Sequence, residues 1–209
     1  MGIITSIEEK RGIYTLYVDG VAFTRVKKKY YEQIVLSEGE ELDEAAYQDR
    51  LSALQFKDAY ETALNLLTTR DMTAHDLISG LKRRGYTEAV SQAICERLQE
   101  NRLINDEQYA QRYVELHQGA QMGRYAIKRK MRAKGLDEQL VDQLLDEEIN
   151  DESQLSAAKA LAEKIKRRYA GQDPRQTRAK ISQAIARRGF SWDILSQALD
   201  SVDLSEWED

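Results

Sequence analysis

One six-residue pattern decides the fold of this chain, and it occurs three times: LKRRGY at Leu81–Tyr86, MRAKGL at Met131–Leu136 and IARRGF at Ile185–Phe190. Each copy runs apolar, basic or small, basic or small, basic, glycine, apolar. The glycines lie 50 and 54 residues apart. Glycine suits the position just after a helix end, where the backbone turns left-handed, and cations in the last turn face the negative end of the helix dipole. The pattern therefore predicts three similar helix ends.

The repetition extends to both sides of the glycine. The helix before it is expected to begin near Thr73, Gly123 and Thr177, and the two threonines are predicted N-caps. Its predicted core positions are Leu77, Ile127 and Ile181, followed by Leu81, Met131 and Ile185. The helix after the glycine is expected to be capped by Thr87, Asp137 and Ser191, with Val90, Leu140 and Ile194 and then Cys95, Leu145 and Leu199 facing inward. Leading helices are predicted at Ala59–Thr69, Asp106–His117 and Gln154–Tyr169. Such three-helix units at a period near 50 should stack into an elongated array.

The first part of the chain has a different pattern. ITSIEE, GIYTLYVDG and VAFTRV carry β-branched and aromatic residues, separated by Arg11-Gly12 and Asp19-Gly20, and together they predict a three-stranded β meander. Helices are expected at Lys27–Leu36 and Leu42–Phe56, with a break at Ser37–Glu40. The chain is therefore predicted to be mainly α-helical. Its expected parts are 1–56 (meander plus helices), three-helix repeats at 57–105, 106–152 and 153–209, and an acidic tail with Trp207 in the last of these.

The charge of the chain is informative only when it is mapped along the sequence. The net value is −5, which argues against a simple nucleic-acid-binding protein. However, the range 124–134 carries six basic residues and no acid, 137–152 carries eight acids and no base, and a second basic stretch covers 164–188. The ordinary interpretation of such stretches is solvated faces joined by weak surface salt bridges. Six aromatic residues could stack on bases, but helical spacing favours packing for most of them: Tyr30, Tyr31, Tyr113, Tyr125, Tyr169 and Trp192.

Several functions and locations are made improbable by what the sequence lacks. One cysteine, Cys95, cannot form an intrachain disulfide, and no uncharged apolar run approaches a membrane span, so we expect a cytoplasmic protein without a membrane segment. The two histidines, His75 and His117, have no companion ligands, and no phosphate-binding loop occurs. We therefore expect no enzymatic activity and no cofactor. A monomer is expected because no long apolar stripe is left over.

The three repeats resemble a known family, the bacterial regulatory proteins RecX. The resemblance covers about Ala59 to Val202 and includes the linker LINDEQYA at Leu103–Ala110. The family pattern of the first repeat is matched by Ala63, Leu67, Arg70, Thr73, Asp76, Leu77 and Leu81. Two positions depart from it, since Asp76 replaces the usual Glu and Asn105 replaces an Asp. The β-rich start is similar to an extension found in longer members.

The resemblance implies a modulator of the RecA recombinase that acts in homologous recombination, DNA repair and the SOS response. Members bind RecA–DNA filaments along the filament groove and suppress ATPase and strand exchange, by blocking growth or by promoting disassembly. The basic helix ends could also contact DNA phosphates weakly and without sequence preference. The expected filament or DNA contacts are Lys82, Arg83, Arg84, Arg124, Lys128, Arg129, Arg132, Lys134, Arg187 and Arg188.

Two alternatives remain open at the level of the sequence. The first is a stand-alone helical-repeat module that binds nucleic acid, although Glu88 and Glu138 stand where a base-reading helix would carry Arg, Asn or Gln. The second is a general protein scaffold, which would show no dependence on a filament.

Overall fold

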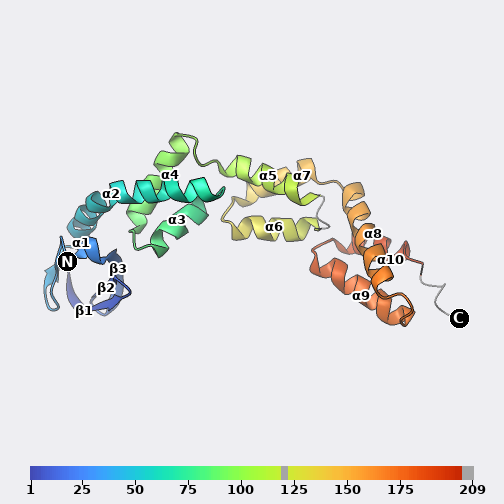
Figure 1. Ribbon diagram of the computed structural model, residues 1–209, viewed down its shortest axis with the longest axis horizontal. Coiled ribbons are helices and arrows are strands. Elements are labelled where there is room, and N and C mark those ends of the chain that lie inside the picture. The colour runs from blue at the N-terminus through green and yellow to red at the C-terminus, as the bar shows by residue number, and fades with distance from the viewer. Residues whose placement is uncertain (119–121, 204–209) are drawn as a thin grey trace. The chain divides into compact units, whose positions relative to one another are not determined.

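The computed structural model describes residues 1–118 and 122–203 of the 209-residue chain (Figure 1). The chain divides into two compact units, Met1–Asn105 and Asp106–Asp209, called here the N-terminal half and the C-terminal half. The predicted acidic tail, including Trp207, lies outside the described residues from position 204 onward.

The predicted β meander is confirmed. Its strands are β1 (Gly2–Lys10), β2 (Ile13–Val18) and β3 (Val21–Lys27), paired antiparallel in sequence order. Both connections place two residues at positive φ, with Asp19 at 49° and Gly20 at 81° in the second turn, as a tight primed hairpin requires. A two-residue strand, β4 (Glu41–Leu42), adds to β1 and gives the order β3-β2-β1-β4. A strand of two residues shows no periodicity, so β4 could not be predicted from local sequence.

The helices that follow the meander differ from the prediction. Only α1 (Lys28–Tyr31) forms within the expected 27–36 helix. The predicted helices at 42–56 and 59–69 are one continuous helix, α2 (Glu44–Thr69), and the predicted domain boundary between residues 56 and 57 falls inside it. The physical reason is that Lys57-Asp58 contains no helix breaker, while Ala59 and Ala63 are fully buried and continue the inward face.

The three-helix repeats are confirmed. The first repeat consists of the second part of α2 with α3 (Ala74–Arg83) and α4 (Glu88–Glu100). The second repeat consists of α5 (Asp106–Gln118), α6 (Arg124–Ala133) and α7 (Glu138–Glu148). The third repeat consists of α8 (Asp151–Arg168), α9 (Pro174–Arg187) and α10 (Trp192–Asp200). Gly85, Gly135 and Gly189 have φ of 82°, 73° and 76°, so each adopts the predicted left-handed conformation after a helix end.

Four of the five predicted side-chain caps are confirmed and one is wrong. Thr73, Thr87, Asp137 and Ser191 each accept a hydrogen bond from a backbone N–H of the next turn. Thr177 is not a cap, because α9 begins three residues earlier at Pro174 and is capped by Asp173, which accepts from the Gln176 N–H. An acceptor followed by proline at the first helical position is a stronger start signal than a lone threonine. Thr177 is instead buried in the helix, and its hydroxyl has no hydrogen-bond partner among the described residues.

The buried side chains form one core in the N-terminal half and two cores in the C-terminal half. The first joins the sheet to α2, α3 and α4. Each C-terminal repeat has a core of its own. The six core positions predicted for the helix before the glycine are all fully buried. In the helix after it, Leu140 is only half-buried, because Val141 takes the inward position of α7. Cys95 is buried, as packing requires.

A carboxylate at Asp58 ties the sheet region to the first repeat. The hydroxyls of Tyr30 and Tyr86 each donate to it at 2.5 Å, and the ammonium of Lys29 lies 2.8 Å away. Burial by itself would raise the pKa of Asp58, but the hydrogen bonds from Lys29 and the two tyrosines outweigh it and hold the pKa well below its usual range. Burial and the hydrogen bond to Asp58 raise the pKa of Tyr86 to about 12. This cluster connects α1, α2 and the turn after α3.

Candidate macromolecular interface

The ten predicted contact residues lie at three helix ends. Lys82, Arg83 and Arg84 end α3 in the N-terminal half. Arg124, Lys128, Arg129, Arg132 and Lys134 lie on α6 or directly after it, and Arg187 and Arg188 end α9, all in the C-terminal half. Seven of the ten residues are exposed, and Arg124, Lys128 and Lys134 are partly exposed. The structure thus makes them accessible, and their intramolecular partners separate them into groups.

One recurrent ion pair ties the end of the second helix to the start of the third helix. Lys82 pairs with Glu88 in the first repeat, and Arg132 pairs with Glu138 at 3.2 Å in the second. The spacing is the same in both. In the third repeat the equivalent positions hold Ala186 and Trp192, so the pair is absent and the tryptophan is 77% exposed. Trp192 is thus an exception among the aromatic side chains, most of which were expected to pack.

A second contact recurs in the second and third repeats and gives Arg124 a structural role. Its guanidinium donates to the Leu145 carbonyl at 3.0 Å and pairs with Asp146 at 2.5 Å. In the third repeat Arg178 repeats the arrangement, donating to the Leu199 carbonyl at 3.2 Å and pairing with Asp200 at 3.0 Å. Each arginine therefore supplies donors to the exposed carbonyl end of the third helix of its own repeat. This structural role of Arg124 could not be predicted from the sequence, because its partners Leu145 and Asp146 lie 21 and 22 residues away.

The remaining predicted residues divide by whether the chain already neutralises them. The Lys128 ammonium lies 2.6 Å from Asp142 and 3.3 Å from Glu138, and its pKa is raised, chiefly by the hydrogen bond to Asp142. Arg84 donates to the Gly80 carbonyl, and Lys134 and Arg188 also have partners within the chain. Three arginines have no hydrogen bond or ion pair from their side chains to the described residues, and these are Arg83, Arg129 and Arg187.

The structure brings the α6 and α9 groups together. The Gly123 N–H donates to the Arg188 carbonyl at 2.8 Å, and the Tyr125 N–H donates to the Gly189 carbonyl at 3.0 Å. A Cβ atom added at Gly123 would lie 2.2 Å from the carbonyl carbon of Gly189, so this contact requires glycine. Tyr125 is 60% exposed, and Arg129 follows it by one helical turn. Because Tyr125 contacts Gly189, two residues after Arg187, Arg129 and Arg187 belong to the same region. Tyr125 is the second exception, whereas Tyr30 is buried and Tyr31, Tyr113 and Tyr169 are half-buried, as expected of most of these aromatics.

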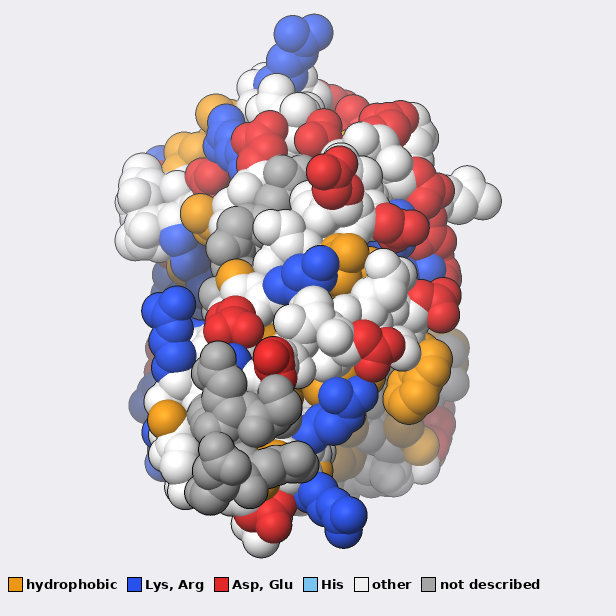
Figure 2. Space-filling model, turned by 90° about the vertical axis from the view of Figure 1, so that its right-hand side faces the viewer, with side chains coloured by type: hydrophobic (Ala, Val, Ile, Leu, Met, Phe, Trp, Pro, Cys, Tyr) orange, Lys and Arg blue, Asp and Glu red, His pale blue; other side chains and the backbone are white. Residues whose placement is uncertain are grey.

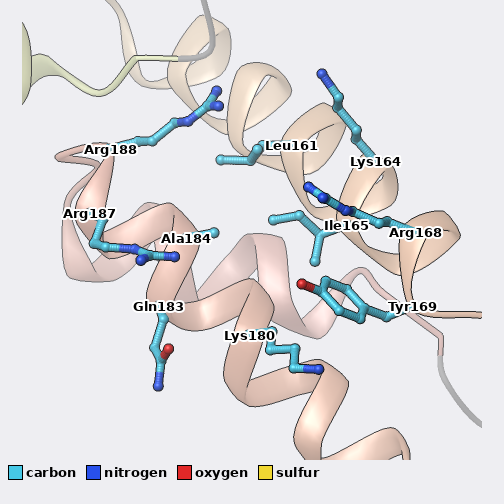
Figure 3. A pocket seen from close by; sticks show the side chains of 10 residues that line it. All are labelled: Leu161, Lys164, Ile165, Arg168, Tyr169, Lys180, Gln183, Ala184, Arg187 and Arg188. Atoms are coloured by element: carbon cyan, nitrogen blue, oxygen red, sulfur yellow. The ribbon is translucent and has the colours of Figure 1, made fainter. Parts of the chain in front are cut away.

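Three further basic residues of the third repeat were not among the contacts predicted from the sequence. Lys164, Arg168 and Lys180 join Arg187 and Arg188 around a hollow of about 410 Å³ between α8 and α9 (Figure 3). A basic stretch at 164–188 was evident in the sequence, but nothing in it showed that residues from two helices face one space. No acidic side chain is among the described residues that line the hollow.

The rest of the exposed surface is of mixed character. On the face drawn in Figure 2, acidic and basic side chains are mixed and apolar ones are scattered among them. None of the helices in the described ranges combines the length and the apolar character needed to cross a membrane. The fold and the charged helix ends define a class, a protein of tandem three-helix repeats with exposed ionic side chains at repeated positions.

Comparison with known proteins narrows this class to one family. Three RecX family models match in order: the first three-helix domain at residues 59–98, the second at 105–145 and the third at 151–199. The regulatory protein RecX of Limosilactobacillus reuteri (strain DSM 20016) is 32% identical over 97% of this chain and 77% of its own length. The Geobacillus protein of that name (strain WCH70) is 30% identical, and the match spans just under two thirds of its length, 66%. This chain belongs to the RecX family.

Solved structures agree with the family assignment. A crystal structure of regulatory protein RecX superposes with a TM-score of 0.65 at 30% identity, covering 96% of this chain and all of the other. RecX from Lactobacillus salivarius gives a TM-score of 0.63 at 29% identity over 73% of this chain. The resemblance inferred from the repeated glycine motif is therefore confirmed.

Proposed function

We propose that this protein is a negative modulator of a RecA recombinase. It binds the RecA–DNA filament and suppresses ATPase and strand exchange, either by blocking filament growth or by promoting disassembly. Support comes from family membership, since all three three-helix domains of the RecX family are present in order. We further propose that it works as a monomer in the cytoplasm and contributes no catalytic group of its own.

The observation that carries the proposal is the segregation of charge between adjacent helices of one repeat. In the second repeat, α6 carries basic residues and α7 carries acidic ones, and only some of them neutralise each other. A filament presents both protein side chains and DNA phosphates, so a surface with both signs can match it. Complementary charge of this kind affects the association rate and the register of binding more than the affinity.

The internal contacts refine the set of residues expected to touch the filament. Arg83, Arg129 and Arg187 offer guanidiniums that need to break no internal ion pair before they bind a phosphate or a carboxylate. Lys82, Lys128 and Arg132 would have to exchange partners. Exposed ion pairs are worth about 0–1 kcal/mol, so this exchange is inexpensive. Arg124 supports α7, and we expect its contribution to binding to be indirect.

The test is the steady-state ATPase rate of the cognate recombinase on single-stranded DNA, titrated with substoichiometric amounts of this protein. Wild-type protein should lower the rate. The variant Arg83→Glu/Arg129→Glu/Arg187→Glu should lose most of this effect, since each substitution reverses an unpaired charge without removing an internal ion pair.

A matched control reverses three other exposed cations that also lack internal partners. Lys57→Glu/Lys159→Glu/Arg175→Glu carries the same change in net charge away from the three helix ends. It should retain most of the suppression. An unchanged ATPase rate with equimolar wild-type protein would refute the proposed function, whereas equal losses in the two triple variants would refute the contact set.

A further inference from the structure

The hollow between α8 and α9 is a built feature of the third repeat. Its floor is apolar and consists of Leu161, Ile165 and Ala184. Arg168 extends from α8 across Ile165, and Arg187 extends from α9 on the opposite side, so two guanidiniums approach the space from different helices (Figure 3). Because both side chains are exposed, the space between them is accessible from solvent.

One end of the hollow is held in place by an aromatic contact. The Lys180 ammonium lies 4.0 Å from the centre of the Tyr169 ring and donates a hydrogen bond to the Gln172 side chain at 3.0 Å. A cation stacked on an aromatic face and anchored by a hydrogen bond loses rotamer freedom before any ligand arrives. This end of the hollow is therefore preorganised.

The other repeats lack the residues that build this site. Counted back from the repeat glycine, the positions of Lys164 and Arg168 hold Tyr60 and Leu64 in the first repeat and Ala110 and Val114 in the second. Counted back from the repeat glycine, the position of Lys180 is occupied by Asp76 in the first repeat and Ala126 in the second. The concentration of positive charge at this place is therefore particular to the third repeat.

The charge of the hollow calls for an anionic ligand. Five cations line it, and Lys164, Arg168 and Arg187 have no ion pair with a described residue. Guanidinium groups bind phosphate through two parallel hydrogen bonds, and they are favoured where phosphate is recognised. An anion bound among these cations would offset their mutual repulsion.

We propose that this hollow binds one nucleotide of single-stranded nucleic acid, with a phosphate between Arg168 and Arg187 and the sugar or base against the apolar floor. The floor favours a single strand because the base of a duplex is already stacked and paired. An acidic peptide would satisfy the charges but would leave the apolar floor uncovered. The inference rests on the proposed function, because the single strand it names is the DNA strand within the filament. The site itself can be tested without a recombinase.

The experiment measures the fluorescence anisotropy of a labelled oligodeoxythymidine with the full chain and no recombinase, over a series of salt concentrations. The variant Arg168→Gln/Arg187→Gln removes one cation from each helix, and the matched control Lys159→Gln/Arg175→Gln removes one from each helix outside the hollow. Loss of two phosphate contacts should flatten the slope of log affinity against log salt by about 1.4 and weaken binding on the order of tenfold. The control should keep the wild-type slope.

Other outcomes overturn the inference. Equal weakening of the two variants would show that net charge, and not the hollow, determines binding. The variant Arg168→Lys/Arg187→Lys keeps the charge but not the paired donors, and it should bind with intermediate affinity. If it binds as wild type, the paired-donor geometry is refuted. Circular dichroism of each variant checks that the helices are retained.

Competitors distinguish the sources of anionic chemistry. Unlabelled single strand should displace the probe at lower phosphate concentration than a duplex of equal length, tripolyphosphate or polyglutamate. Displacement by tripolyphosphate or polyglutamate at equal charge concentration would refute the nucleotide assignment. Photo-crosslinking with 4-thiothymidine should label the 164–169 segment, and labelling confined to other segments would contradict the site.

The two proposals fail in different measurements. The hollow is tested by anisotropy without recombinase, and the filament function is tested by the ATPase rate with wild-type protein. Loss of oligonucleotide binding in Arg168→Gln/Arg187→Gln with full ATPase suppression would support the hollow and show that regulation does not use it. Absence of suppression by a wild-type protein that still binds the oligonucleotide would refute only the filament function.

Discussion

Replacement of Asp58 by asparagine should destabilise the N-terminal half without altering its fold. Asp58 accepts hydrogen bonds from the hydroxyls of Tyr30 and Tyr86 and lies near the ammonium groups of Lys27 and Lys29, 3.4 and 2.8 Å away. Hydrogen bonds to a charged group contribute about 1.5–3 kcal/mol each. The Asp58 side chain is 35% exposed, so solvent screening reduces each phenol–carboxylate bond to about 1 kcal/mol. Asparagine keeps an acceptor but loses the charge, which weakens both phenol bonds and removes the attraction to the two ammonium groups, so the expected total loss is about 2 kcal/mol.

The assay is hydrogen exchange of the full chain, read in peptides from α2 and α3. A loss of about 2 kcal/mol corresponds to roughly 30-fold faster exchange of the most protected amides, if they exchange through cooperative opening of this half. Asp49→Asn is the matched control, because Asp49 is an exposed acid on the same helix whose side chain makes no hydrogen bond or ion pair with described residues. An effect of Asp58→Asn no larger than that of the control would refute the reasoning.

Three further predictions follow from the same geometry. The pKa of Asp58 is depressed in the folded state, so the contribution of Asp58 to stability is full above the ordinary pKa of 3.8 and is lost as the pH falls below that value. Hydrogen exchange of α2 measured at decreasing pH should show this loss in the wild type and a smaller loss in Asp58→Asn. Gly123→Ala should cost about 1–3 kcal/mol by forcing the start of α6 away from Gly189, with faster exchange in α6 and α9, and unchanged exchange there would contradict the close approach. Arg124→Ala should destabilise the second repeat by about 1–2 kcal/mol in urea denaturation, through lost contacts to the end of α7, whereas Arg129→Ala should stay within about 0.5 kcal/mol. Equal effects of the two arginine variants would argue against the structural role of Arg124.

The partners within the chain show which basic residues at the helix ends have a structural role and which can bind a ligand. A basic residue near a helix end is ambiguous in sequence, since it can stabilise the helix dipole, pair with a neighbouring acid or contact a ligand. The structure assigns Arg124 to the first kind of task, by supporting a neighbouring helix end, and Lys82 and Arg132 to the second. Arg83, Arg129 and Arg187 have no such partner among the described residues, and we propose that these three contact the filament.

Local sequence signals were sufficient to predict the helical repeats. The glycine motif predicted three left-handed helix ends at Gly85, Gly135 and Gly189, because few other residues adopt positive φ at low cost. Thr87 and Ser191 were predictable caps, because a short hydroxyl side chain before a helix satisfies an otherwise unpaired N–H. The meander followed from alternation and from two turn dipeptides. Each of these signals acts over a few residues.

Contacts between distant segments could not be predicted in the same way. The strand β4, the Asp58 cluster, the approach of Gly123 to Gly189 and the hollow between α8 and α9 all join residues that are far apart in the sequence. Their formation depends on helix lengths and on which faces meet, and no local pattern encodes either. The sequence by itself thus determined the repeats, their caps and the family of this protein, while only the tertiary structure decided which cations are neutralised and which remain available to a ligand, because neutralisation depends on partners brought together by folding.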